Sequence, residues 1–208
     1  MKLLPRRQFI RNSTLALGAS VLAGPFIRSV RAGEPGPNDK IRLGLIGSGG
    51  MGCGDLECFF GNPEVDCVVI ADVDEAMTAK GLKVCETAGR KKPDTVQDFR
   101  RVLDRKDVDV VLIATPDHWH APISLAAMKL GKHVYCEKPL AHTIEETRIM
   151  ARVAAETKVV TQMGNTGHAS EGLRLTKEWI DAGAIGAVTE VHVWSDRPGK
   201  FWDSQWLP

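Results

Sequence analysis

The sequence predicts a doubly wound α/β fold, in which helices cover both faces of a parallel sheet, followed by the start of a second, α+β domain. An apolar run at 41–46 stops at a glycine-rich turn that opens an apparent helix. A second buried run, 65–71, stops at Asp72. Strand-like and helical segments then keep alternating to residue 163, and this alternation is typical of a parallel sheet with right-handed crossovers.

The glycine-rich turn carries a G-x-G-x-x-G motif over residues 47–52. Gly47 would allow a tight turn out of the strand, Gly49 a close approach of a pyrophosphate, and Gly52 close packing of helix on strand. Phosphates would then bind free N–H groups at the start of the helix. The motif predicts a Rossmann-type dinucleotide-binding domain; the alternative for a single match is a structural turn.

Asp72 supplies the acidic residue that the glycine motif requires, twenty residues after Gly52. A carboxylate at this position can accept hydrogen bonds from ribose hydroxyls and would repel a 2′-phosphate. NAD is therefore the expected cofactor and NADP the less favoured one. The alternative is that Asp72 merely caps the helix that begins near residue 74.

Residues 1–32 read as a targeting segment rather than as part of the fold. They contain six basic residues and no acidic one, and an apolar stretch at 13–27 follows the pair Arg6-Arg7. This pattern is typical of a twin-arginine export signal and predicts a periplasmic location. The apolar stretch is too short to span a bilayer easily, so no stable membrane span is expected; an uncleaved surface helix or anchor is the alternative. A proline- and glycine-rich linker, 33–39, follows.

Charge and cysteine content exclude other classes of protein. The whole chain has a net charge of +1, but the part after residue 32 is acidic and has no basic run, which gives no reason to propose nucleic acid as a partner. The five cysteines form no C-x-x-C pair, and Cys67 and Cys136 lie in apolar runs, so we interpret them as packing residues.

The remaining elements follow from apolar spacing, helix caps and breakers. The near-continuous apolar run at 108–114 is typical of a buried parallel strand. Thr143 and Glu146 form a capping box that starts a helix. The expected helices are 51–60, 74–88, a turn around 99–103, one ending near 129–131, 143–156 and 173–181, and the further expected strands are 95–96, 133–136, 159–163 and 187–194.

Two loops at strand ends contain the unusual residues. Thr115-Pro116-Asp117-His118-Trp119-His120 follows one strand, and Glu137-Lys138-Pro139 follows the next. Ligands of open α/β sheets bind outside the carboxyl ends of the strands, so both loops should border the crevice of the glycine turn. The two histidines lack the further ligands of a metal site, and no metal is predicted.

Three segments, GLIGSGGMG, ATPDHWHAP and GKHVYCEKPLA, together resemble the Gfo/Idh/MocA oxidoreductase family over about residues 40–194. The resemblance implies an NAD(P)-dependent enzyme acting on sugars or polyols, with a Rossmann domain at 40–165 and the start of a substrate domain at 166–208. It implies that Lys138 is catalytic, that the peptide before Pro139 is often cis, and that Asp117 replaces a family Asn. The residues expected to line the cofactor site are Gly47, Gly49, Gly50, Met51, Gly52, Asp72, Thr115, Pro116, His120, Glu137 and Asn165.

The chemistry of Lys138 agrees with that role. Alcohol oxidation removes the hydroxyl proton while hydride leaves carbon, and a lysine in a partly desolvated cleft beside a cationic ring loses its own proton more readily. Glu137 could orient this lysine or pair with it. The alternative is a surface lysine that precedes an ordinary turn.

The last fifteen residues hold three of the five tryptophans and nothing that could bury them. The family's second domain is larger, so we interpret the sequence as a fragment or truncated product, with a homo-oligomer possible at full length. Three functions compete: an NAD-dependent sugar or polyol oxidoreductase, a glycosidase that oxidises its sugar transiently with bound NAD, and a nucleotide-binding fragment without activity.

Overall fold

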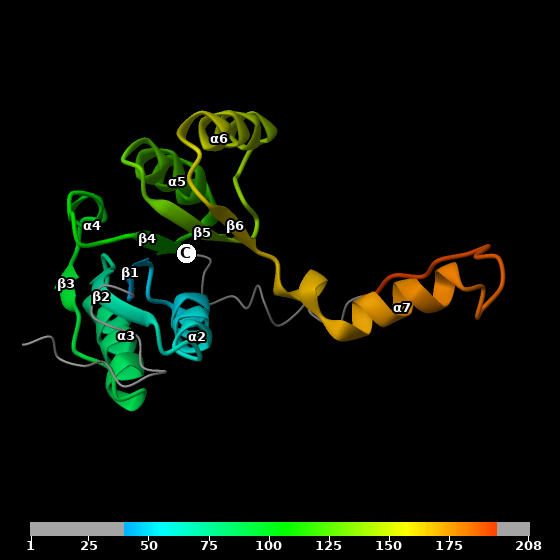
Figure 1. The fold of residues 1–208 in the computed structure, drawn as a ribbon, viewed down its shortest axis with the longest axis horizontal. Helices are drawn as coiled ribbons and strands as arrows, with labels where there is room; N and C mark the ends of the chain where they lie inside the picture. Colours follow the sequence, from blue (N-terminus) through cyan, green and yellow to red (C-terminus); the bar gives the residue numbers. More distant parts are fainter. Residues whose placement is uncertain (1–39, 195–208) are drawn as a thin grey trace, which may run out of the picture.

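The computed structural model describes residues 40–194. The predicted export signal (1–32), the linker (33–39), Trp202 and Trp206 lie outside the described residues. Within the described residues, six strands form one parallel sheet in the order β3-β2-β1-β4-β5-β6 (Figure 1). The strands are β1 (Ile41–Ile46), β2 (Val65–Ala71), β3 (Asp94–Val96), β4 (Val110–Ile113), β5 (His133–Glu137) and β6 (Thr161–Gly164).

Helices cover both faces of the sheet (Figure 1). They are α2 (Gly50–Phe59), α3 (Glu75–Thr87), α4 (Arg100–Leu103), α5 (His120–Lys129), α6 (Ile144–Thr157) and α7 (Glu171–Asp181), with single turns η1 (Asp117–Trp119) and η2 (Thr166–Ala169). α2 packs beside α3 on one face, and α5 packs beside α6 on the other. The predicted doubly wound α/β fold is confirmed.

Two apolar clusters, one on each face of the sheet, form the core. The alternation of side chains along a strand assigns Leu112 of β4 to the cluster under α2 and α3, and its neighbours Val111 and Ile113 to the cluster under α4, α5 and α6. β4 is therefore apolar on both faces, as a central strand of a parallel sheet requires. Cys67, Cys85 and Cys136 are buried in these clusters, which confirms their packing role, and burial raises the pKa of Cys136 to about 11. The same interpretation is wrong for Cys58, which is exposed on α2, and Cys53 is only partly buried.

Most predicted elements appear within one or two residues of their expected bounds. The capping box of α6 is present: the Thr143 side chain accepts from the Glu146 N–H, and Glu146 accepts from the Thr143 N–H. The strand predicted at 187–194 is wrong, because this segment forms no regular element. Its alternating pattern finds no strand to pair with among residues 40–194, and a strand alone cannot satisfy its backbone.

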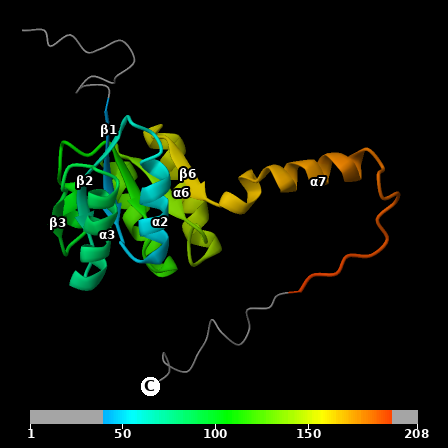
Figure 2. The ribbon, with the colours of Figure 1, turned by 90° about the horizontal axis from the view of Figure 1, so that it is seen from below.

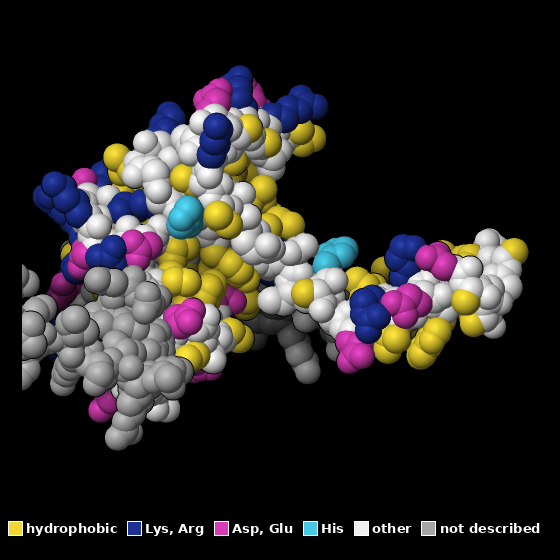
Figure 3. Space-filling model, in the orientation of Figure 1, with side chains coloured by type: hydrophobic (Ala, Val, Ile, Leu, Met, Phe, Trp, Pro, Cys, Tyr) yellow, Lys and Arg dark blue, Asp and Glu magenta, His cyan; other side chains and the backbone are white. Residues whose placement is uncertain are grey.

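α7 extends away from the sheet, as Figure 2 shows, and none of its residues is buried. Leu173, Trp179 and Ile180 lie exposed along it, and Figure 3 shows apolar side chains gathered on one side of this helix. No helix within residues 40–194 has both the length and the apolar character that crossing a membrane demands.

Candidate functional site

The site begins where the strand order reverses. β1 lies between β2 and β4, so the loops that leave β1 and β4 diverge at the carboxyl edge of the sheet, the place where open α/β sheets form their ligand crevice. The glycine loop that follows β1 occupies this point. The sequence-predicted residues at the ends of β1, β2, β4 and β5 are therefore brought to the same edge of the sheet.

Two of the three motif glycines are required by contacts with backbone. Gly47 has a φ of +90°, and a Cβ there would lie 2.7 Å from the carbonyl oxygen of Ala114 at the end of β4. A Cβ on Gly52 would lie 2.0 Å from the carbonyl oxygen of Gly47. Because backbone atoms cannot rotate away as side chains can, the loop folds this tightly only with glycine at both positions.

The other glycines leave room for a ligand. A Cβ on Gly49 or Gly50 would meet no atom within 4 Å. No side chain caps the start of α2, its first turn contains no acidic residue, and Met51 is 50% exposed. The N–H groups at this end of α2 can therefore bind an anion, which the helix dipole also favours. A pyrophosphate fits the open space and the free donors.

Asp72, at the end of β2, holds the glycine loop in place. One carboxylate oxygen accepts from the Ser48 N–H at 2.7 Å, and the other accepts from the Asp74 N–H at 3.0 Å. Asp74, not Asp72, caps α3 by accepting from the Ala76 N–H. Because a carboxylate has about four lone-pair positions, Asp72 can still accept from ribose hydroxyls.

Ser48 has a role that the sequence reasoning missed. It is fully buried, and its backbone N–H joins the loop to Asp72. Its side-chain hydroxyl also reaches the same carboxylate oxygen, at 3.3 Å. Its place as the first variable position between two motif glycines was the available signal.

His120 connects the loops that follow β4 and β5. It is 1% exposed, with Nδ1 at 2.6 Å from the carbonyl oxygen of Pro139 and Nε2 at 2.7 Å from that of Thr115. Carbonyl oxygens only accept, so a neutral ring with one N–H satisfies one of them and a doubly protonated ring satisfies both. Both nitrogens are thus engaged within the protein, and this geometry favours a role in holding the loops over direct contact with a cofactor.

The neighbours of His120 in its loop differ in exposure. Thr115 is half-buried, with a hydroxyl that has no hydrogen-bond partner among the described residues. Pro116 is exposed at the same strand end, where a ligand can reach it. Asp117, the residue that departs from the family pattern, lies 3.7 Å from the exposed His118 side chain and begins η1.

Glu137 and Lys138 end β5 and differ sharply in exposure. Glu137 is 3% exposed, whereas Lys138 is exposed at the edge of the crevice. The Glu137 carboxylate accepts from the Lys138 backbone N–H at 3.3 Å, and the structure records no ion pair between the two side chains. The Lys138–Pro139 peptide is cis, as the resemblance implies.

Asn165 lies apart from the glycine loop. It follows β6, the edge strand, which is separated from β1 by β4 and β5. It is half-buried at the turn into η2, and its N–H donates to the Met163 carbonyl. Its side chain could meet only the part of a ligand that extends past β5.

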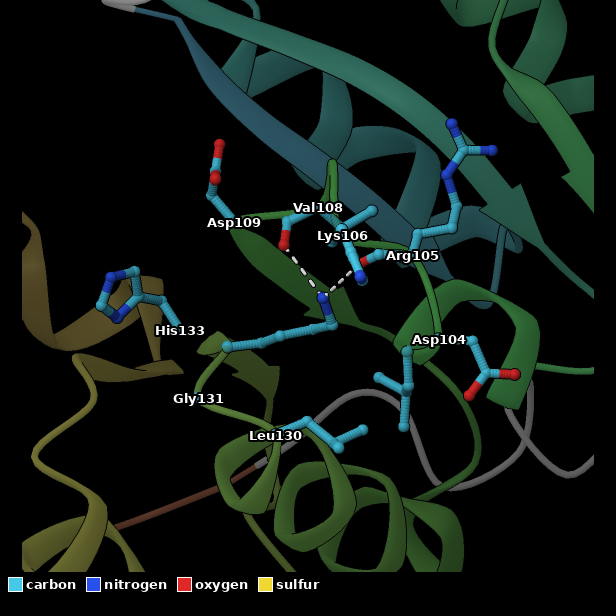
Figure 4. Close-up of a pocket in the computed structure, with 10 residues that line it drawn as sticks. Asp104, Arg105, Lys106, Val108, Asp109, Leu130, Gly131 and His133 are labelled. Atoms are coloured by element: carbon cyan, nitrogen blue, oxygen red, sulfur yellow. Dashed lines mark hydrogen bonds between the residues drawn. The ribbon is translucent and has the colours of Figure 1, made fainter.

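A hollow of about 530 Å³ lies at the opposite, amino edge of the sheet (Figure 4). Its lining comes from the segments that precede β4 and β5. The buried Lys132 donates there to the carbonyl oxygens of Arg105 and Val108, at 2.6 and 3.0 Å. These bonds tie two backbone segments together, and the hollow is far from the crevice, so we do not assign the candidate site to it.

The glycine loop lies at the point where the strand order reverses, with open space beside its anion-binding N–H groups. These two features define the class of the domain, which is a dinucleotide-binding α/β domain. The family model "Oxidoreductase family, NAD-binding Rossmann fold" (GFO_IDH_MocA) matches residues 41–165. The chain belongs to this family. NAD is accordingly its cofactor, and the resemblance on the three sequence segments is confirmed.

Individual relatives support this family assignment. Levoglucosan dehydrogenase of Pseudarthrobacter phenanthrenivorans is 32% identical over 77% of this chain and 43% of its own length. A glycosyl hydrolase family 109 protein of Shewanella pealeana is 31% identical over 74% of this chain and 38% of its own length. The solved structure of a levoglucosan dehydrogenase with NADH and levoglucosan is 33% identical, with a TM-score of 0.57 over 71% of this chain and 40% of that one. The chain spans less than half the length of these relatives.

Proposed function

We propose that this chain provides the nucleotide-binding part of an NAD-dependent oxidoreductase that acts on a hydroxyl of a sugar or polyol. The observation that carries the proposal is the position of Lys138, an exposed lysine at the end of β5 on a loop that His120 ties to the end of β4. That position borders the crevice whose glycine loop suits a dinucleotide. The similarity to a dehydrogenase of levoglucosan supports a sugar as substrate.

In this proposal NAD, when bound, supplies the hydride acceptor. The residues of the chain do the rest. Gly49, Gly50 and the start of α2 bind the pyrophosphate, and Asp72 accepts from the ribose. Lys138 takes the hydroxyl proton in the oxidative direction and, protonated, polarises the carbonyl oxygen in the reverse direction. The substrate hydroxyl must therefore lie within hydrogen-bond reach of the Lys138 amine.

Lys138→Ala in the full-length protein tests this role. We expect NAD affinity to stay nearly unchanged, because the glycine loop and Asp72 hold the cofactor. Turnover should fall by about 10²- to 10⁴-fold, the usual loss when a positioned acid or base is removed. Lys83→Ala is the matched control, since Lys83 is exposed on α3 and, among residues 40–194, pairs with Glu86 alone. Wild-type turnover by Lys138→Ala would remove this lysine from the mechanism.

A second function is supported by the relatives of glycosyl hydrolase family 109. Such an enzyme would oxidise its sugar transiently with bound NAD and release the leaving group by elimination. Both functions need Lys138, so the products must separate them. A net oxidoreductase accumulates NADH or consumes an acceptor, whereas the glycosidase releases an aglycone without net redox change. If the full-length protein binds NAD but shows neither activity, its function is that of a nucleotide-binding protein without catalysis.

We also propose that the protein is exported to the periplasm by the twin-arginine route, and that it carries its cofactor with it. Arg6-Arg7 ahead of the apolar stretch 13–27 supports this. The double change Arg6→Lys, Arg7→Lys should strand precursor in the cytosol, measured by fractionation. The single change Arg11→Lys is the control. Normal processing of the double variant would refute this route.

A further inference from the structure

Two acidic side chains are buried behind Lys138. Asp55 of α2 is 7% exposed and Glu137 of β5 is 3% exposed. Each has one buried oxygen, Oδ2 of Asp55 and Oε1 of Glu137, without a hydrogen-bond partner among the described residues. Burying a polar oxygen without a partner costs about 1–3 kcal/mol, so each oxygen calls for a donor.

The packing of α2 on β5 sets these two residues on facing surfaces. Asp55 lies one helical turn before Phe59, whose ring meets the Tyr135 ring edge-on at a centroid distance of 5.2 Å. Tyr135 and Glu137 are two residues apart on β5 and share one face of the sheet. Phe59 therefore packs against Tyr135, and Asp55, one turn earlier in α2, is placed toward Glu137.

Gly164 on the neighbouring strand β6 closes the other side. A Cβ on Gly164 would lie 1.8 Å from Oε1 of Glu137 and 3.0 Å from the Tyr135 hydroxyl oxygen. The Glu137 carboxyl group thus rests directly on the backbone of β6, beside the Tyr135 hydroxyl. This contact leaves the unpartnered oxygen little freedom to turn toward solvent.

The surroundings of Asp55 and Glu137 disfavour the ionisation of both carboxyl groups at once. Burial, and then the Glu137 charge, raise the pKa of Asp55 to about 6, and only Lys138 acts in the opposite direction. Burial, the two carboxylates and Cys58 raise the pKa of Tyr135. These are the titratable groups that face Asp55 from its own helix and from β5.

We propose that Asp55 is a positioning residue that, while protonated, donates its proton to the unpartnered oxygen of Glu137, so that the protonated pair presents one negative charge behind Lys138. The shared proton satisfies both orphaned oxygens at once. A single negative charge orients the Lys138 segment through the backbone N–H that donates to the Glu137 carboxylate. The significance for Lys138 rests on the proposed function; the shared proton itself does not.

Infrared spectroscopy of the folded 208-residue chain tests the shared proton directly. We expect one component of the protonated-carboxyl C=O band to persist above pH 5 and to disappear with a midpoint near pH 6, and we expect this component to be missing from Asp55→Asn. An ordinary aspartate would lose this band near pH 4. A midpoint near pH 4, or a pH 6 transition that persists in Asp55→Asn, would overturn the proposal.

The pH dependence of stability gives a second readout. A carboxyl group with a raised pKa binds more protons in the folded than in the unfolded state, so its contribution to stability is lost as pH rises through about 6. Asp55→Asn should therefore gain stability over the unmutated chain as pH rises from 4 to 7. Asp109→Asn is the control with the opposite sign, because Arg42 lowers the pKa of Asp109 and this contribution is lost as pH falls below 4. Equal pH profiles for the two variants would contradict the proposal.

The full-length protein separates this inference from the proposed function. Turnover of Asp55→Asn should lack the wild-type transition near pH 6, a change that a purely structural role would not produce. An unchanged pH profile would overturn the positioning role of Asp55. Full activity of Lys138→Ala would refute the proposed function instead, and the infrared result on Asp55 would stand.

Discussion

Asp72→Ala should weaken both the glycine loop and the choice of cofactor. The change removes the acceptor of the Ser48 N–H, at 2.7 Å, and of the Asp74 N–H, at 3.0 Å. Ser48 is fully buried, so its N–H is left unpaired, which costs about 1–3 kcal/mol, whereas the exposed Asp74 N–H can turn to water.

The same change should narrow the preference for NAD over NADP. A hydrogen bond to a charged group contributes about 1.5–3 kcal/mol, so losing the ribose contact should weaken NAD binding about ten- to a hundredfold. Loss of the carboxylate also removes its repulsion of a 2′-phosphate, which should improve NADP binding.

Calorimetric titration of the folded chain with each nucleotide, together with urea denaturation, measures both effects. Asp74→Ala is the matched control: it removes the cap of α3, at a cost of about 1 kcal/mol, and leaves the ratio of the two affinities unchanged. Tighter binding of NADP than of NAD by the unmutated chain would refute the reasoning. So would an Asp72→Ala variant that keeps the full gap between the two nucleotides.

Two further changes test the loop and α7. Gly52→Ala places a Cβ 2.0 Å from the Gly47 carbonyl oxygen and should lower the free energy of unfolding by about 1–3 kcal/mol or more. Gly54→Ala enters open space in the same helix and should raise the free energy of unfolding by about 1 kcal/mol. Equal shifts of the two melting temperatures would contradict this reasoning. The exposed apolar side chains of α7 should make the chain bind a hydrophobic dye, and Leu173→Ser with Trp179→Ser should reduce the fluorescence. A monodisperse, dye-silent chain would show that this surface is covered.

Local patterns predicted the elements and the glycine loop because those features depend on near neighbours in the sequence. Apolar runs and caps identified the strands and helices. The backbone contacts of Gly47 and Gly52 explain why the motif requires glycine at these two positions. The spacing of Asp72 behind Gly52 likewise placed the carboxylate beside the loop. The alternation at 187–194 misled, since a strand also needs a partner, which no local pattern supplies.

Contacts across the sheet could not be predicted in this way. The bridge of His120 from Thr115 to Pro139 depends on β4 and β5 being neighbours and on how far their loops extend. The burial of Glu137 depends on Gly164, which lies on another strand. One local signal was available for Asp55: it sits three residues after Gly52, on the face of α2 that the motif turns toward the sheet.

The bridge through His120 constrains how this protein can diversify. Because one ring nitrogen faces each loop, an insertion or deletion in either loop would break a buried hydrogen bond and disturb the other loop as well. New substrate preferences are therefore easier to acquire in the segment after Gly164, which carries no such link among the described residues. For an engineer, the two bridged loops are best kept as a fixed frame, and sequence libraries are best directed to residues from 165 onward.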